Sequence, residues 1–154
     1  MSFLRNMWAC IAARKGADPW FCLPVAVAML FDAAVSLACQ PGAYWNHPAA
    51  VDEANSTWGR LLALGPAAFI LGFVVYVGVM MCLLLWLSGA LQKLLGAFVL
   101  LAHSYGTASW CQVRLPGPVY WWALMGLFLV EAAALAAYWR LRERWLKARA
   151  AAMN

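Results

Sequence analysis

Four long runs of apolar residues divide the chain, at about 20–39, 59–87, 90–112 and 119–139. Each run reaches the roughly 20 residues that a helix needs to cross the hydrocarbon core of a bilayer. Apolar residues are continuous within the runs and do not alternate with a period of two, which favours helices over a membrane β-barrel. The pattern predicts one all-α domain over residues 1–154, a polytopic membrane bundle of four transmembrane helices.

Turn-forming residues separate the runs. Gln40-Pro41-Gly42 follows the first run, Ser88-Gly89 the second, and Arg114 to Pro118 the third. Residues 43–58 form the longest polar stretch and are expected outside the bilayer. Gly65-Pro66 is expected in the first turns of the second helix, where a missing backbone donor costs little.

The segment before the first run predicts a different kind of helix. Residues 2–15 combine apolar side chains at helical spacing with basic side chains elsewhere on the helical wheel. This pattern is typical of a short amphipathic helix in the membrane interface.

Composition supports a membrane location and argues against an enzyme. Hydrophobic residues make up 66% of the chain and charged residues 11%, against about 45–50% and 25% in soluble domains. So small a globule cannot bury that excess, and a disordered chain would need the opposite balance. Little length remains for a soluble catalytic module, and no GxSxG, HExxH, P-loop or GxGxxG motif occurs. We therefore expect a protein that is not an enzyme.

Basic residues predict the orientation. Nine of the 11 Lys and Arg residues lie at the two chain ends or beside Ser88-Gly89, and two lie on the other side. The positive-inside rule then places both termini in the cytoplasm. Residues 140–154 form a basic tail, for which we expect anionic lipid as the partner and not nucleic acid.

Three ionisable residues, Asp32, His103 and Glu131, lie within the apolar runs. Such groups are expensive in hydrocarbon and should face the bundle interior or a partner. At 1.5 Å per residue their depths fall within roughly 7 Å of one another, and Asp32 and His103 are nearly level. We therefore expect Asp32 and His103 to lie within one water-bridged contact, or to face a shared cavity.

The same three residues allow three interpretations. They can form a hydrogen-bonded polar cluster that fixes helix packing. His103 can instead bind a cofactor, namely a pigment, haem, quinone or metal. As a third alternative, Asp32 and Glu131 can carry protons through a small transporter.

Small residues predict close helix contacts. Ala102 and Gly106 form a small-xxx-small pair in the third run, and alanines are frequent in the fourth. Such surfaces allow two helices to approach closely, so the third and fourth helices are expected to pack tightly.

Two of the five cysteines, Cys39 and Cys111, lie at the outer ends of their helices. Disulfides persist in the bacterial periplasm, so a bridge between these two is possible. The chain has no CxxC pair, so no thioredoxin-like site is expected.

Residues 30–110 resemble a group of small bacterial four-span membrane proteins. The likeness consists of Asp32, the Gln40-Pro41-x-x-Tyr44-Trp45 turn, Glu53-x-Asn55 and Leu61-Leu62-x-x-Gly65-Pro66, followed by His103 in the third helix. The group has Pro where this chain has Ser56. The resemblance implies a bacterial source and brings no activity with it.

From the sequence we expect a non-catalytic accessory subunit of a bacterial inner-membrane complex, packed against other integral membrane subunits. The alternatives are a cofactor-binding subunit that uses His103, and a small transporter that uses Asp32 and Glu131.

The topology can be tested by cysteine-accessibility labelling. Cys10 and cysteines introduced after Arg140 should react from the cytoplasmic side, and cysteines introduced into residues 43–58 from the opposite side, because the basic residues fix the orientation. Labelling of residues 43–58 from the cytoplasm would contradict the whole arrangement.

Overall fold

The computed structural model describes residues 18–151. Within this range the chain forms no β-strand, and four helical segments are long and apolar enough to cross a membrane. They are η1 with α2 (Pro19–Ala38), α4 (Pro66–Trp86), α5 (Gly89–Arg114) and α6 (Gly117–Ala151). The expected all-α bundle is confirmed. The interfacial helix expected over residues 2–15 lies outside the described residues.

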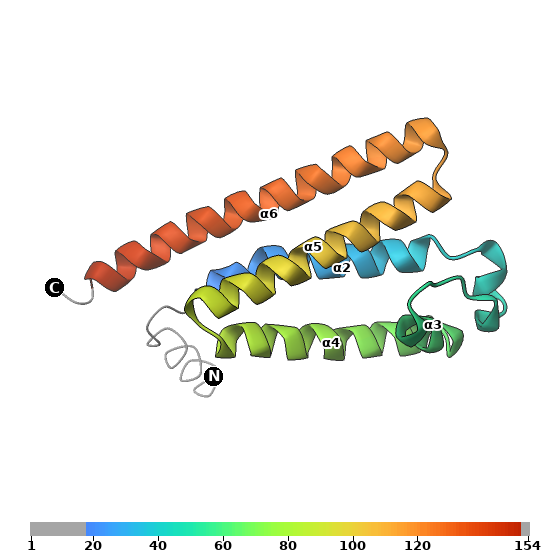
Figure 1. The fold of residues 1–154 in the computed structure, drawn as a ribbon, viewed down its shortest axis with the longest axis horizontal. Helices are drawn as coiled ribbons and strands as arrows, with labels where there is room; N and C mark the ends of the chain where they lie inside the picture. Colours follow the sequence, from blue (N-terminus) through green and yellow to red (C-terminus); the bar gives the residue numbers. More distant parts are fainter. Residues whose placement is uncertain (1–17, 152–154) are drawn as a thin grey trace.

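The four long helices run up and down the bundle (Figure 1). The beginning of α2 and the end of α6 lie at the same end of the bundle as the short connection between α4 and α5. The longer connection from α2 to α4 contains η2 (Gly42–Trp45), η3 (Pro48–Ala50) and α3 (Ser56–Ala63), and it lies at the other end with the α5–α6 turn (Figure 1). An even number of crossings explains why the two ends of the described chain share a side.

The second apolar run is not one helix, so the expected span over 59–87 is wrong. α3 ends at Ala63, and Gly65 adopts φ 115° before α4 starts with Pro66. Gly tolerates this positive φ at little cost, whereas other residues are strained there. Pro66 then fits the first helical position, where its missing N–H is not needed. The membrane-spanning part therefore begins at Pro66.

α3 is a separate, capped helix. The Asn55 side-chain oxygen accepts hydrogen bonds from the backbone N–H groups of Thr57, at 3.0 Å, and Trp58, at 3.3 Å. These bonds satisfy two donors that the start of a helix leaves free. The cap fixes where α3 begins, and with it the position of Trp58.

α6 continues without a break from the apolar run into the basic tail. Its 35 residues correspond to about 52 Å at 1.5 Å per residue, longer than the roughly 30 Å hydrocarbon core. In the tail, the Arg142 guanidinium lies 6.0 Å from the Trp139 ring centroid, and Arg149 lies 5.4 Å from that of Trp145. The basic end of α6 is therefore a helical extension of the span.

The most extensive helix packing joins α2 to α5, and α5 and α6, which were expected to pack tightly, contact each other less extensively. Glycines of α5 make this approach possible. A Cβ atom on Gly96 would lie 2.3 Å from Phe21, and one on Gly106 would lie 2.8 Å from the Asp32 carboxylate. The small residues of the third run therefore face α2 and make room for its larger side chains.

At each end of the bundle, a buried glutamine side chain forms hydrogen bonds to the backbone of a non-helical segment. The Gln92 side-chain amide donates to the Asp18 carbonyl and accepts from the Asp18 N–H, both at 3.0 Å. The Gln40 amide pairs in the same way with the backbone of Asp52, at 3.2 and 3.0 Å. Each glutamine thus satisfies the backbone N–H and C=O groups of one residue in a non-helical segment, which would otherwise lose their hydrogen bonds on burial.

Cys39 and Cys111 are both free thiols, so the possible disulfide is not formed in the structure. Burial raises the pKa of the Cys39 thiol, and the nearby Arg114 opposes this only in part. Because the thiolate is the form that attacks in disulfide chemistry, a raised pKa makes Cys39 less reactive.

Replacing Gly65 with Ala should destabilise the fold. A Cβ at Gly65 meets nothing within 4 Å, so the cost is that of the backbone conformation alone (φ 115°, ψ 164°), which residues other than Gly rarely adopt, about 1–3 kcal/mol. Thermal unfolding in detergent, followed by circular dichroism, measures it. The matched control is Gly78→Ala, which also has open space around it but lies inside α4; its better helix propensity should leave stability equal or higher. Equal effects of the two substitutions would contradict the role given to Gly65.

Candidate functional site

A cavity of about 310 Å³ lies between α2, α4 and α5, beside the segment that leads into α3. It occupies the half of the bundle nearest the α2–α4 connection. Its wall consists of Asp32, Ala33, Ser36, Glu53, Asn55, Trp58, Phe69, Phe73, Tyr76, Ala102, His103, Gly106, Ser109 and Trp110.

Asp32 and His103 meet at the cavity wall. The Nδ1 atom of His103 lies 2.7 Å from the Asp32 Oδ2 atom, and the two side chains are only 10% and 18% exposed. The residues expected at the same depth are therefore in direct hydrogen-bonded contact, closer than a water-bridged pair. A buried, charge-assisted hydrogen bond of this kind is among the stronger polar contacts in proteins.

Gly106 and Thr107 complete the surroundings of the Asp32 carboxylate. Gly106 leaves the space that the carboxylate occupies, and the Thr107 hydroxyl donates to Oδ1 at 3.4 Å. His103, Gly106 and Thr107 share one face of α5 because they are three and four residues apart. The sequence analysis read Gly106 as a packing residue; that spacing from His103 was the signal for its second role.

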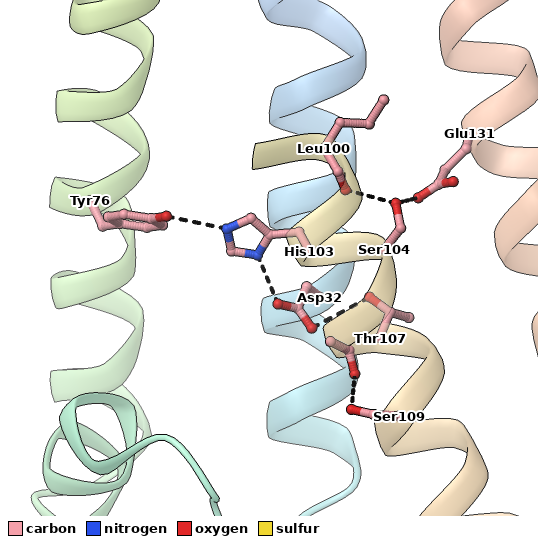
Figure 2. Close-up of polar contacts among 9 residues, drawn as sticks. Asp32, Tyr76, Leu100, His103, Ser104, Thr107, Ser109 and Glu131 are labelled. Atoms are coloured by element: carbon pink, nitrogen blue, oxygen red, sulfur yellow. Dashed lines mark hydrogen bonds and ion pairs between the residues drawn. The ribbon is translucent and has the colours of Figure 1, made fainter. Parts of the chain in front are cut away.

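Tyr76 of α4 joins the pair from the other side. Its hydroxyl lies 3.3 Å from the Nε2 atom of His103 (Figure 2). When the Asp32 carboxylate is ionised, Nδ1 must carry the hydrogen that it donates, so Nε2 accepts from the Tyr76 hydroxyl. Tyr76–His103–Asp32 is therefore a continuous hydrogen-bonded chain across three helices. Sequence analysis missed Tyr76, since one tyrosine in an apolar run gives no signal of its partner.

Glu131 does not join this chain. Its carboxylate accepts a hydrogen bond from Ser104, whose hydroxyl also lies 2.8 Å from the Leu100 carbonyl oxygen. Figure 2 shows His103 and Ser104 leaving α5 on different sides, His103 toward α4 and Ser104 toward α6. The expected cluster of three ionisable residues is thus divided in two, with Glu131 serving the α5–α6 contact.

Glu53 supplies the second carboxylate of the cavity wall. It lies just before α3, and its Oε1 atom accepts from the Asn55 N–H at 2.9 Å. Burial raises the pKa of the Glu53 carboxyl, and Asp32 and Asp52 raise it further, while the backbone N–H groups of Asn55 and Ala54 oppose the shift. In the sequence, Glu53 stands out only as part of the Glu53-x-Asn55 segment of the resemblance.

Aromatic rings form another part of the cavity wall. The Trp58 ring packs against those of Phe69, Phe73 and Tyr76 at centroid distances of 5.9, 5.6 and 5.3 Å. The tilted and edge-on arrangements are those that aromatic pairs prefer. α3 therefore brings Trp58 over the cavity and fixes it there.

The surroundings of His103 do not suit a metal or a metalloporphyrin. Nδ1 is held by Asp32, and Tyr76 occupies the position at Nε2 from which the ring would ligate a metal. Among residues 18–151, no three His, Cys, Asp or Glu side chains gather in a way that could hold a metal ion.

Comparisons of this chain with protein-family models, curated proteins and solved structures found no match.

A double-mutant cycle on Asp32→Asn and His103→Gln tests the energetic importance of the pair. Each substitution should destabilise the bundle by about 1–3 kcal/mol, because Asp32→Asn removes the carboxylate charge from the bond and His103→Gln removes the imidazole that contacts both Asp32 and Tyr76. Their effects should be non-additive, with a coupling of about 1–3 kcal/mol. Thermal or denaturant unfolding in detergent gives the four values.

The control for this cycle combines Asp32→Asn with Ser104→Ala. Ser104 neighbours His103 in sequence but contacts Glu131, so these effects should add to within about 0.5 kcal/mol. Additivity of the Asp32 and His103 substitutions would show that their contact contributes nothing of its own.

Proposed function

We propose that this chain is a small membrane carrier that binds a solute in the cavity and exchanges a proton through the Asp32–His103 pair. The observation that carries this proposal is the position of the pair: it is nearly buried among membrane-spanning helices, yet it lines a cavity large enough for a ligand. Ionisable groups at such depth are costly and commonly mark solute or proton paths.

The cavity suits a small solute. At about 310 Å³ it lies at the lower end of the roughly 300–1,000 Å³ typical of ligand sites. Apolar rings and a few polar groups share its wall, which is the usual composition of such sites.

The Tyr76–His103–Asp32 chain offers two protonation states. With neutral His103 and ionised Asp32 the pair carries one negative charge. A proton taken up at Nε2 gives imidazolium beside carboxylate, with no net charge, and the Tyr76 hydroxyl must then turn its hydrogen away. A charge change of one unit in a low-dielectric site alters the affinity for a bound solute substantially, so proton binding and solute binding are linked.

The remainder of the bundle separates the cavity from the opposite end. Val25, Met29, Leu84 and Val99 are buried together in the core, in the half that contains the α4–α5 connection. A carrier with the site accessible from one side has this arrangement, and repacking of these side chains would be needed to open the other.

The location and orientation proposed for this carrier follow from the basic residues. In a bacterial inner membrane with cytoplasmic termini, the cavity faces the periplasm and the basic end of α6 lies at the anionic cytoplasmic leaflet. The tryptophans and arginines of that segment suit the interface.

The accessory role expected from the sequence is supported by a different feature. Only 11% of the most apolar stretch of α6 is buried within the bundle. The rest of that stretch is available to lipid or to another subunit. Contact with lipid explains the exposed surface of α6 without a partner subunit. A role in packing against other subunits, in contrast, does not explain the cavity beside Asp32 and His103. We therefore favour the carrier.

Proteoliposomes that enclose a pH-sensitive dye provide the test. A panel of small cationic, anionic, zwitterionic and neutral solutes is added outside, with the membrane potential clamped by potassium and valinomycin. At least one class should cause a change in internal pH with wild type. Asp32→Asn and His103→Gln should each reduce the initial rate at least tenfold, since either removes the proton-exchanging pair.

Ser104→Ala is the matched control and should retain the wild-type rate. Absence of proton movement with every solute class, in protein shown to be folded and monodisperse, would rule out the proposed carrier. Unchanged transport by His103→Gln would remove the role given to the pair.

A further inference from the structure

We propose that the cavity selects a small organic ammonium ion, held between the carboxylates of Asp32 and Glu53 and the aromatic rings around Trp58. This inference rests on the proposed function, because it names the solute class of the same cavity.

The ionisable side chains of the cavity wall favour a cation. Asp32 and Glu53 both line the cavity, and none of its described lining residues is Lys or Arg. Carboxylates in a cleft with low-dielectric walls concentrate a negative potential there. An anion would meet two carboxylates with no Lys or Arg side chain to offset them, so the site discriminates against it.

Glu53 is available for a ligand. Among the residues that the structure describes, it forms no ion pair; its Oε1 atom accepts from a backbone N–H. The basic residue of this region, Arg114, pairs with the neighbouring Asp52. Arg114 therefore neutralises the aspartate outside the cavity and leaves the glutamate on its wall uncompensated.

The aromatic rings explain why an organic cation fits better than a hydrated metal ion. Trp58, Phe69, Phe73 and Tyr76 surround one side of the space. Rings of this kind attract alkylammonium groups through their negative faces, and sets of them form the usual binding site for quaternary ammonium ions. A metal ion would require several oxygen ligands, and the described residues offer no suitable group of three acidic, His or Cys side chains.

The protonation of Glu53 should also make cation affinity depend on pH. Asp32, His103 and Tyr76 on the helices, and Asp52 beside Glu53, are the titratable groups around this carboxylate. Burial raises its pKa above the ordinary value for Glu, so it takes up a proton at a higher pH than an exposed Glu. Cation affinity should therefore fall as pH decreases towards that pKa, since the protonated carboxyl has no charge.

Equilibrium binding to the purified full-length protein in detergent tests the inference. The probes are choline and its neutral isostere 3,3-dimethylbutan-1-ol, together with butylammonium and its neutral counterpart butan-1-ol. At neutral pH at least one cation should bind at least tenfold more tightly than its isostere. Equal affinity of cation and isostere in both pairs, or no binding of either cation, would overturn the inference.

Two substitutions in the cavity have matched controls elsewhere. Glu53→Gln should weaken cation binding about tenfold and reduce its dependence on pH, whereas Glu143→Gln, on the exposed tail of α6, should change neither. Trp58→Phe retains an aromatic ring but has a weaker cation attraction, and should weaken binding severalfold. Trp121→Phe, on the exposed side of α6, should not.

The transport panel separates this inference from the function it rests on. Proton movement driven by an anionic or neutral solute, with no response to choline or butylammonium, would overturn the ammonium selectivity and leave the carrier intact. Proton movement driven by no solute, combined with tight choline binding, would retain the site and overturn the carrier.

Discussion

The contact between α2 and α5 determines the rest of the architecture. Two helices with polar residues in their interior cannot leave them facing lipid, because an unpaired polar group in hydrocarbon costs several kcal/mol. Asp32 and His103 satisfy each other across this contact at 2.7 Å. The approach that their bond requires is possible because Gly106 has no side chain where the carboxylate lies. Gly106 thus permits both the close spacing of the two helices, together with Gly96, and the position of the carboxylate.

The cavity depends on how the connection between α2 and α4 is held against the bundle. Gln40 binds the backbone of Asp52, and this holds the next residue, Glu53, against the cavity. Asn55 then caps α3 and sets Trp58 over the rings of α4. A segment that composition alone describes as a polar loop is therefore fixed at three successive points. Preorganisation of this kind lowers the entropic cost of ordering a binding site when the ligand arrives.

Charge is distributed unequally between the two ends of the bundle. At the end that contains the α4–α5 connection, Asp18 accepts from Tyr138 and Arg142, each at 2.8 Å, so its carboxylate is paired. At the other end Arg114 pairs with Asp52. Asp32 contacts His103 and Thr107 there, and Glu53 accepts from a backbone N–H, so neither carboxylate has a Lys or Arg partner. Of these four carboxylates, the two that have no Lys or Arg partner, those of Asp32 and Glu53, both line the cavity, where the aromatic rings are. The ammonium selectivity follows from this combination and not from either feature alone.

The apolar pattern was sufficient to predict four membrane-spanning helices, because hydrophobic length is a local property of the chain. It also placed Asp32 and His103 at one depth, since helical rise converts sequence position into depth. Depth does not fix which neighbour a side chain faces, and for that reason Glu131 was grouped with them although it turns toward Ser104. The hydrophobic pattern did not show the break at Gly65 because the residues on both sides are apolar, although the Gly65-Pro66 pair is itself a signal for the end of a helix. Tyr76 and Glu53 gave no signal for a related reason: they reach His103 and the cavity from segments distant in sequence, and helix packing alone decides which such segments meet.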